Sequence, residues 1–451
     1  MQNLEADYLV IGAGAMGLAF IDEVATRDRT ATFILVDKRS NPGGHWNDAY
    51  SFVTLHQPAA FYGVNSMVLG RGGASLASGV EVLAYYDRVM TKLLETGRVQ
   101  YFPMCVYEGD RKFSSMIDAE CTYEVKVGRR TVDASYMNVQ VPATTPPKYQ
   151  VSSGVELVPL NDLVKIRKPH DGYVIVGAGK TGIDAVLFLL EQNVDPKRIT
   201  WIVSNDSWLL DRGGLRPGIT FQWFLQQVRA ITEADSLNDV TSSLEAEKVF
   251  FRIDPSIEPT KFRCATVDRE ELAQLRRIEN VVRMGRVVQI DPGMITLEQG
   301  TFATPEDVLH VDCTADPLAK RPVVPVFEGS TITLQSLSMC QQVFSASLIG
   351  YLECRFDDDV TRNALSHPVP HPEFTRDYIP AVWRTLANLD LWMRKLGRWM
   401  RTSRLAYSAH DSIWSTLRYG LEARYLQDRA FESMRKLYGQ EFPGETFEGD
   451  V

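Results

Sequence analysis

The stretch DYLVIGAGAMGLAF, residues 7–20, predicts a short apolar strand, a Gly-x-Gly-x-x-Gly turn and the start of a helix. In such a turn the first glycine permits the tight bend, the second lets the backbone approach a pyrophosphate, and the third lets the helix pack closely on the strand. The helix N-terminus adds free N–H groups and a partial positive charge. The predicted dinucleotide contacts in this stretch are Gly12, Gly14, Ala15, Met16 and Gly17.

An acidic residue stands where a dinucleotide site needs one. A second apolar strand over 32–36 ends at Asp37, 20 residues beyond Gly17, and its carboxylate can accept hydrogen bonds from a ribose diol. Lys38 follows and is assigned to the same site. The alternative is a tight strand-to-helix turn without a ligand. Strand, helix and acid nevertheless occur in the register that a nucleotide requires, which favours binding.

Length and charge restrict the class of protein. At 451 residues the chain exceeds what one hydrophobic core usually serves, so two or three domains are expected. A hydrophobic fraction of 45% and a charged fraction of 23% are typical of a soluble globular protein. The net charge of -9 argues against nucleic-acid binding, because that function needs a basic surface.

The six cysteines show no CxxC pair and no cluster with the spacing of metal ligands, so we expect reduced, mostly buried thiols. The first residues carry no basic and apolar signal, and no stretch reaches the ~18 apolar residues of a membrane span. We therefore expect no integral membrane segment and a cytoplasmic location.

Two polar and aromatic loops follow the first motif. The turn-rich segment 38–46 contains Gly43 and Gly44, which allow close backbone approach, and then His45 and Trp46. The next loop, 50–67, is rich in aromatic residues and lacks helical or strand periodicity. Loops beside a cofactor motif often line a site. The two adjacent polar residues in this loop, His56 and Gln57, are the predicted catalytic residues and would form the polar side of the active site. A purely structural role for both residues is the alternative.

A second fingerprint appears in GYVIVGAGKTGIDAVLFLL, residues 172–190, and proposes a second nucleotide site. The next strand, 200–203, ends before Ser204 and Asn205, where an adenine ribose would lie. No arginine or lysine falls there, which favours NADH, or NADPH supported by Arg212. Loss of the nucleotide from this half is the alternative. The predicted contacts are Gly177, Gly179, Lys180, Thr181, Gly182, Ser204 and Asn205.

The remaining segments suggest how the two motifs are covered. Residues 81–95 predict an amphipathic helix and 99–141 a β-meander that turns at 128–130. The region of about 213–265 is predicted to be a helical insertion that reaches over the cofactors. The last residues, 361–451, are mainly helical and contain a basic amphipathic segment at 389–405. Its apolar stripe favours core, lid or subunit contact, including a homodimer, over a membrane surface.

The paired fingerprints, Asp37 and the Gly-Gly-His-Trp segment together resemble the class B flavin monooxygenases, over about residues 5–355. The resemblance implies FAD at the first fingerprint and NAD(P)H at the second. It implies that Gly43, Gly44, His45, Trp46 and Gln57 lie at the FAD, that 308–316 including Asp316 is the last strand and turn of that domain, and that 333–347 lies along the flavin. The implied fold class is α/β with two Rossmann-like domains: FAD-binding 1–165 and 305–360, NAD(P)-binding 166–304, and the helical cap 361–451.

Three departures from the family pattern affect the expected chemistry. The family places FxGxxxHxxx(Y/W) between its two sites, and here Asn161-Asp162 stands where His-Ser would be. The arginine that Baeyer-Villiger members use cannot be assigned from sequence. The asparagine near the flavin of N- and S-oxygenating members is replaced within residues 55–58.

The resemblance implies a monooxygenase that uses NAD(P)H and O₂ through a flavin C4a-(hydro)peroxide to oxygenate a small, largely apolar or aromatic substrate. A reductase or dehydrogenase without oxygenation is the alternative. Its disulfide-reductase version is disfavoured because no two cysteines lie within six residues of each other. A nucleotide-bound scaffold protein is the third class.

Overall fold

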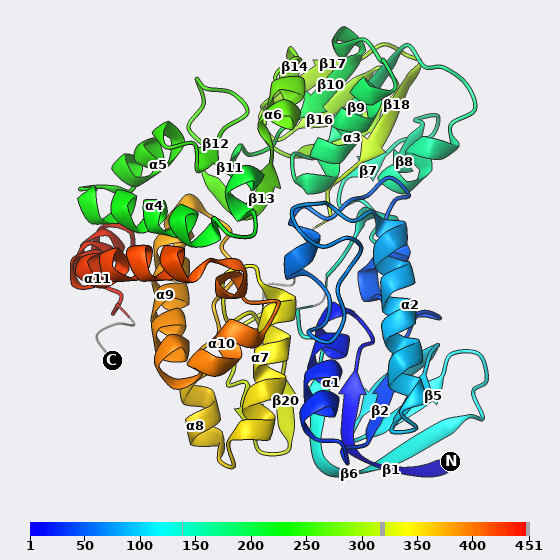
Figure 1. The fold of residues 1–451 in the computed structure, drawn as a ribbon. Coiled ribbons are helices and arrows are strands. Elements are labelled where there is room, and N and C mark those ends of the chain that lie inside the picture. Colours follow the sequence, from blue (N-terminus) through cyan, green and yellow to red (C-terminus); the bar gives the residue numbers. More distant parts are fainter. Residues whose placement is uncertain (138, 316–320, 448–451) are drawn as a thin grey trace.

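The computed structural model describes residues 1–137, 139–315 and 321–447. It is a mixed α/β protein in which the sheet of β9, β10 and β18 lies above the sheet of β1, β2 and β6, and the C-terminal helices lie to one side (Figure 1). Asp316, predicted at the cofactor, lies outside the described residues.

The first sheet contains the first glycine motif. Its order is β19-β20-β6-β1-β2-β3, with β1, β2, β3, β6 and β20 parallel. Helices α1, α2 and α7 pack against its core, and α1 lies beside α7. The strands are β1 (Gln2–Ile11), β2 (Phe33–Val36), β3 (Val99–Phe102), β4 (Cys105–Gly109), β5 (Lys112–Ser115), β6 (Thr122–Asp133), β19 (Phe327–Glu328) and β20 (Thr331–Thr333); the helices are α1 (Ala15–Arg27), α2 (Gly79–Glu95) and α7 (Gln342–Arg355).

The predicted turn at 128–130 is wrong. Strand β6 runs without a break from Thr122 to Asp133, and its register against β1 shifts between Ala6 and Tyr8. Gly128 therefore belongs to a β-bulge, which glycine tolerates as readily as a turn, so the glycine signal alone was ambiguous.

The second sheet holds the second glycine motif. It is fully parallel in the order β14-β10-β9-β18-β8 and carries α3 (Lys180–Glu191) and α6 (Arg269–Leu275). Residues 308–312 were expected in the first domain. This expectation is wrong, because they form β18, which pairs with β9 and β8. The strands are β8 (Leu157–Pro159), β9 (Gly172–Val176), β10 (Ile199–Ile202), β14 (Asn280–Val282) and β18 (Val308–Asp312). All five residues of β18 are buried, as suits a central parallel strand, but an apolar run does not reveal which sheet it joins.

The predicted helical insertion is only partly helical. Helices α4 (Thr220–Glu233) and α5 (Leu237–Ala246) are followed by β12 (Phe250–Phe251) and β13 (Lys261–Val267), which pair with β11 (Ser207–Asp211). A separate sheet joins β7 (Gln150–Val151), β15 (Val287–Asp291), β16 (Met294–Leu297) and β17 (Gly300–Ala303).

The C-terminal helices are α8 (Asp359–Ala364), α9 (Tyr378–Lys395), α10 (Gly397–Thr402) and α11 (Ile413–Glu441). The apolar stripe of 389–405 is core, since Trp392, Leu396 and Trp399 are buried in the same cluster as α1. Within the described residues, no helix combines the length and the apolarity that crossing a bilayer requires.

Arg404 fastens the end of this helical region to the loop at 59–64. Its guanidinium donates to the carbonyls of Ala60 at 2.8 Å, Tyr62 at 2.7 Å and Val64 at 2.8 Å. The C-terminal region thus fixes the backbone of the aromatic loop that follows His56 and Gln57.

Candidate cofactor and active site

The first glycine turn has the geometry of a phosphate cradle. Gly12 has a φ of +108°, and a Cβ on Gly17 would collide with the Gly12 carbonyl oxygen. Helix α1 begins after Gly14 with no side-chain cap and no acidic residue in its first turn. Its N-terminal N–H groups, including those of Ala15 and Met16, are therefore available to an anion.

The Gly43-Gly44 segment folds over this turn. The Gly43 N–H donates to the Ala13 carbonyl at 2.9 Å, and a Cβ on Gly44 would come within 3.0 Å of the Gly14 Cα. Both residues 43 and 44 have positive φ, +114° and +60°. The close approach of two backbones explains why glycine occurs in both segments.

Asp37 and Trp46 of the first site have defined partners, while Lys38 is exposed. The Asp37 carboxylate is buried and accepts from the N–H groups of Ala13 at 2.6 Å and Arg39 at 2.7 Å. Trp46 is buried and its indole N–H donates to the Tyr62 hydroxyl at 2.7 Å. Asp37 therefore helps to shape the glycine turn, and each of its oxygens keeps a lone pair for a ribose.

The second glycine turn is more open than the first. Gly177 has a φ of +117°, and a Cβ on Gly182 would collide with the Gly177 carbonyl oxygen. A Cβ on Gly179 would meet no atom within 4 Å, and α3 also lacks a side-chain cap. Thr181, in the first turn of α3, is half-buried. There is space at Gly179 for a pyrophosphate.

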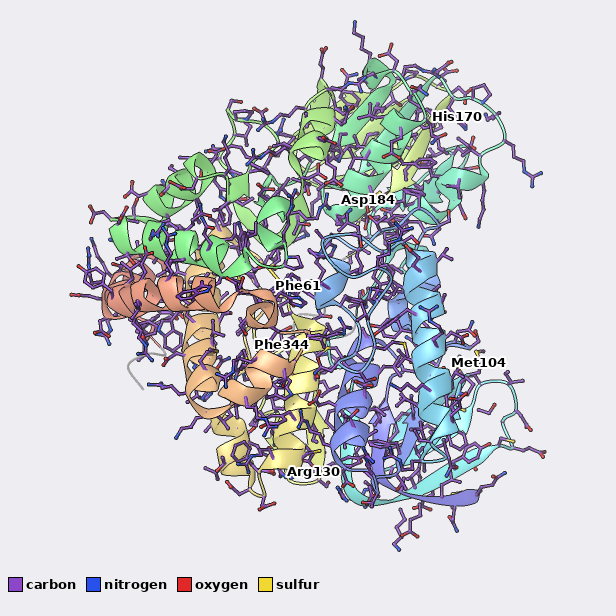
Figure 2. The ribbon with its side chains drawn as sticks, in the orientation of Figure 1. Phe61, Met104, Arg130, His170, Asp184 and Phe344 are labelled. Atoms are coloured by element: carbon purple, nitrogen blue, oxygen red, sulfur yellow. A yellow bond between two sulfur atoms is a disulfide. The ribbon has the colours of Figure 1, made fainter. Side chains whose placement is uncertain are left out.

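Asp184 connects the two halves of the site (Figure 2). Its carboxylate pairs with Lys180 on the same helix and accepts from the Tyr50 hydroxyl of the loop after the first motif. Burial and the Asp184 charge hold the pKa of Tyr50 well above its ordinary value, so the phenol keeps its proton and donates it. The loop after the first motif and the helix after the second glycine turn are thus joined by a contact that sequence alone did not indicate.

A cation does lie beside the predicted adenine-ribose position. Asp206 follows Ser204 and Asn205, and Arg283 pairs with its carboxylate through two hydrogen bonds of 2.8 and 3.1 Å. Arg283 follows β14, which runs parallel to β10, so the carboxyl ends of both strands lie together. The linear sequence hides this neighbour because 77 residues separate the pair.

Arg212 is directed elsewhere than predicted. It is buried, pairs with Glu271 and with Asp268 at 3.1 Å, and its charge acts on His56. Its Nη1 is buried without a hydrogen-bond partner among the described residues. The structure therefore places a cation near the predicted catalytic loop.

His56 and Gln57 are both held by partners from distant segments. Thr266 on β13 donates to the His56 carbonyl, and Gln341 donates to the Gln57 side-chain oxygen at 3.1 Å. Part of the His56 side chain is exposed to solvent, while protein atoms surround its imidazole. The resulting desolvation, with Lys180 and Arg212, lowers the pKa of His56 to about 3.

His45 is also neutral near pH 7, because burial and then Arg39 lower its pKa to about 4. Asn161, which replaces the family histidine, donates from its side chain to the Asp48 carbonyl at 3.0 Å. This bond ties the segment between the two sites to the 3₁₀ turn Gly44–Asp48. Asn161 thus contacts the backbone of the first site.

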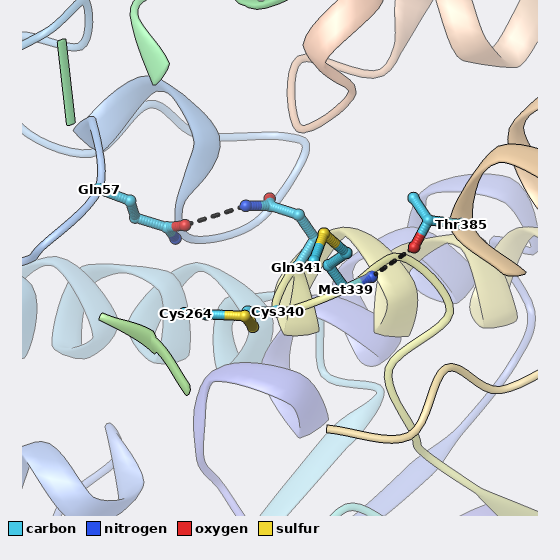
Figure 3. The surroundings of a disulfide bond; sticks show 6 residues. All are labelled: Gln57, Cys264, Met339, Cys340, Gln341 and Thr385. Carbon is cyan, nitrogen blue, oxygen red and sulfur yellow. Dashed lines mark hydrogen bonds between the residues drawn. A yellow bond between two sulfur atoms is a disulfide. The ribbon is translucent and has the colours of Figure 1, made fainter. Parts of the chain in front are cut away.

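A disulfide joins Cys264 on β13 to Cys340, directly before Gln341 (Figure 3). The expectation of six reduced cysteines is therefore wrong for these two, while Cys105, Cys121, Cys313 and Cys354 are free. The Cα atoms lie 6.7 Å apart although 76 residues separate them in sequence. Pairing depends on distance in the fold, which cysteine spacing does not report.

Mycobacterial proteins share 44% identity with this chain over 422 residues, which cover 90% of the chain and 78% of each relative. They include the uncharacterized proteins Rv2000 of Mycobacterium tuberculosis strain H37Rv and Mb2023 of Mycobacterium bovis. The chain belongs to this family. No family model matches the sequence of this Rv2000-family protein.

Solved structures share the fold of this Rv2000-family chain. Polycyclic ketone monooxygenase from the fungus Thermothelomyces thermophila has a TM-score of 0.51 and 13% identity, covering 96% of this chain and 90% of its own. Cyclohexanone-bound cyclohexanone monooxygenase in its rotated conformation has a TM-score of 0.51 and 12% identity, covering 96% and 99%. The flavin-monooxygenase fold expected from the motifs is thereby confirmed.

Proposed function

We propose that this protein is a FAD-dependent monooxygenase that uses NAD(P)H and O₂ to oxygenate a small, largely apolar or aromatic substrate. One observation carries the proposal: two helix N-termini without side-chain caps each follow a glycine turn, and Tyr50, from the loop after the first motif, donates to Asp184 on the second of these helices. Such a pair of turns suits two dinucleotides that must exchange a hydride.

FAD fits the first half. The turn at Gly12, Gly14 and Gly17 would hold its pyrophosphate, and Asp37 would accept from its ribose. Gly44, His45, Trp46 and Gln57 would flank the rest of the cofactor. When bound, the flavin supplies hydride acceptance and reaction with O₂, while the protein orients it and excludes water. The corresponding domain would comprise residues 1–137 together with the segment from β19 through α7, because β8 pairs with β18 in the second sheet.

NAD(P)H fits the second half, built around Gly177, Gly179 and Gly182. Lys180 and Thr181 begin the helix at the phosphates, and Ser204 and Asn205 border the ribose. Asp206 suits the hydroxyls of an NADH ribose, whereas Arg283 suits the 2′-phosphate of NADPH. Asp206 and Arg283 form an ion pair, so a group suited to NADH and a group suited to NADPH lie side by side in this site.

The polar wall consists of His56, Gln57 and Arg212. His56 is a neutral imidazole at neutral pH and can donate or accept one hydrogen bond. The free Nη1 of Arg212 would stabilise negative charge that develops on an oxygen atom in this recess. Arg212 is thus our candidate for the arginine that sequence could not assign.

A reductase without oxygenation is the second candidate. The Cys264–Cys340 disulfide favours it, because Cys340 adjoins Gln341, which contacts the proposed flavin-side residue Gln57. A disulfide accepts two electrons, as a reduced flavin delivers them.

Stopped-flow absorbance and isotope labelling separate these candidates. The purified protein should be yellow from non-covalent FAD, and anaerobic NADH or NADPH should bleach it. Exposure to ¹⁸O₂ with a panel of apolar ketones, amines and sulfides should then place one labelled oxygen in a product. Consumption of NAD(P)H without label in any product, coupled to loss of the disulfide, would favour the reductase; failure of both coenzymes to bleach the flavin would contradict both.

A further inference from the structure

Three soft metal-ligand side chains converge outside the glycine turns. The Sγ atoms of Cys264 and Cys340 and a ring nitrogen of His371 all lie within 4.8 Å of one another. Cys264 is buried, and Cys340 and His371 are half-buried. Cysteine spacing does not reveal this cluster, because the three residues come from distant segments: β13, the loop before α7 and the linker before α9.

Backbone contacts hold the three segments together independently of the disulfide. The N–H of Phe262, on β13, donates to the Glu373 carbonyl at 3.1 Å, and the N–H of Val369 donates to the Ser336 carbonyl at 2.7 Å. The linker is therefore fastened to β13 on one side of His371 and to the Cys340 loop on the other. Lys261 strengthens the first attachment by pairing with Glu373 at 3.1 Å.

We propose that the reduced pair, Cys264 and Cys340, forms with His371 a Zn²⁺-binding site. Two thiolates and one imidazole are preferred zinc ligands, and three protein ligands leave the fourth tetrahedral position to water. Zn–S bonds of about 2.3 Å and a Zn–N bond of about 2.0 Å place neighbouring ligand atoms under about 4 Å apart. The three side chains already lie close to this arrangement.

Metal binding and the disulfide exclude each other. A dithiol reductant gives two electrons and two protons to the S–S bond, which breaks to two thiols while the reductant becomes a disulfide. Zn²⁺ then displaces both thiol protons and forms two Zn–S bonds. Oxidation of the pair reverses this and releases the metal. The site is therefore occupied only when the chain is reduced.

The other cluster of this kind, Glu156 with His170 and Asp307, does not need a metal. Lys168 already lies between its carboxylates, 3.6 Å from Glu156 and 3.2 Å from Asp307. A protein cation thus neutralises that cluster. Cys264, Cys340 and His371 have a softer donor set, which suits zinc rather than an ammonium group.

Zinc titration of the full-length protein tests the proposal. The protein is first freed of metal and reduced by a dithiol, and the dithiol is then removed under argon. This protein should bind one Zn²⁺ per chain, as measured by competition with a chromogenic chelator. C264S and C340S should each weaken binding by about 100-fold or more, and H371Q by at least about tenfold. C354S removes an exposed free thiol and is the matched control, with unchanged affinity. Co²⁺ should give sulfur-to-cobalt charge-transfer absorption in wild type and C354S, and this absorption should be strongly reduced in C264S and C340S.

Alkylation of the wild type covers the case in which a cysteine variant fails to fold. Zn²⁺ should protect Cys264 and Cys340, but not Cys354, from iodoacetamide, as mapped by peptide mass spectrometry. The proposal is overturned if reduced wild type binds no more Zn²⁺ than the oxidised protein, if C264S or C340S keeps full affinity, or if zinc gives no protection. None of these readouts requires bound flavin.

Discussion

The indole N–H of Trp399 donates a 2.8 Å hydrogen bond to the Glu23 carboxylate, so the C-terminal helix α10 is joined to the first helix α1 inside the core. Glu23 also pairs with Arg27 at 2.5 Å and accepts from Asn65 at 2.6 Å and Ser347 at 2.9 Å. One buried carboxylate therefore connects α1, the aromatic loop, α7 and α10. Helix α10 is therefore part of the core around the first sheet, whereas α11 packs against α4.

Replacing Trp399 with Phe should lower the free energy of unfolding by about 1–3 kcal/mol, because a buried carboxylate loses a donor. Urea unfolding followed by circular dichroism measures this. Trp414→Phe is the control: Trp414 is 81% exposed, and its loss should change stability by less than about 0.5 kcal/mol. Equal effects of the two substitutions would contradict the core role of Trp399.

The two glycine turns predict separable effects on the two cofactors. A Cβ on Gly14 meets Gly44 at 3.6 Å, an ordinary contact, and a Cβ on Gly179 meets nothing within 4 Å, so both alanine variants should fold. Gly14→Ala should lose FAD, and Gly179→Ala should keep FAD but weaken NAD(P)H. Flavin absorbance per chain and coenzyme titration provide the measurements. A Gly14→Ala protein with full flavin, or a Gly179→Ala protein with unchanged coenzyme affinity, would contradict the assignment.

Arg283→Gln should weaken NADPH binding by about tenfold or more while changing NADH binding little, since a charged hydrogen bond contributes about 1.5–3 kcal/mol. The two dissociation constants are obtained by fluorescence titration of each coenzyme. Arg277→Gln serves as a control, because Arg277 bonds only its helical neighbour Gln274. Equal weakening of both coenzymes by Arg283→Gln would show that Arg283 does not contact the 2′-phosphate.

Acid should destabilise the protein through His45 and His56, whose pKa values are lowered in the folded state. The unfolded chain binds protons on these side chains near pH 6.5, whereas folded His56 and His45 do so only near pH 3 and 4. At pH values between those limits the unfolded chain binds more protons than the folded protein. The contribution of the two histidines to the free energy of unfolding is therefore fully present above about pH 6.5 and decreases as the pH falls toward 4. The urea midpoint should follow this trend, and it should fall less in the double variant H45Q/H56Q. A double variant with the wild-type pH profile would exclude this origin.

Local features were the ones that the sequence predicted well. Both glycine turns, the strands before them and the helix at 79–95 depend on residues that are close in the chain, so periodicity and glycine spacing were sufficient. The apolar stripe of 389–405 was expected to be core, lid or subunit contact, and the structure places it in the core.

Contacts between distant segments were not predictable in the same way. Arg283 reaches Asp206 because β14 lies parallel to β10, and Gln341 reaches Gln57 because α7 returns to the first unit. The pairing of Cys264 with Cys340, and the choice of sheet that β18 joins, depend on the same kind of long-range contact. Each residue was visible in the sequence, but its neighbour was set by the way the sheets assemble.

The three carbonyl bonds of Arg404 have a consequence for biosynthesis. The side chain that fixes the backbone of the loop at 59–64 is synthesised 340 residues after Val64. The loop that follows His56 and Gln57 therefore reaches its final form only after Arg404 has left the ribosome. We expect cofactor loading to follow the synthesis of this helical region, so a nascent chain that holds only the first glycine turn should not retain the cofactor.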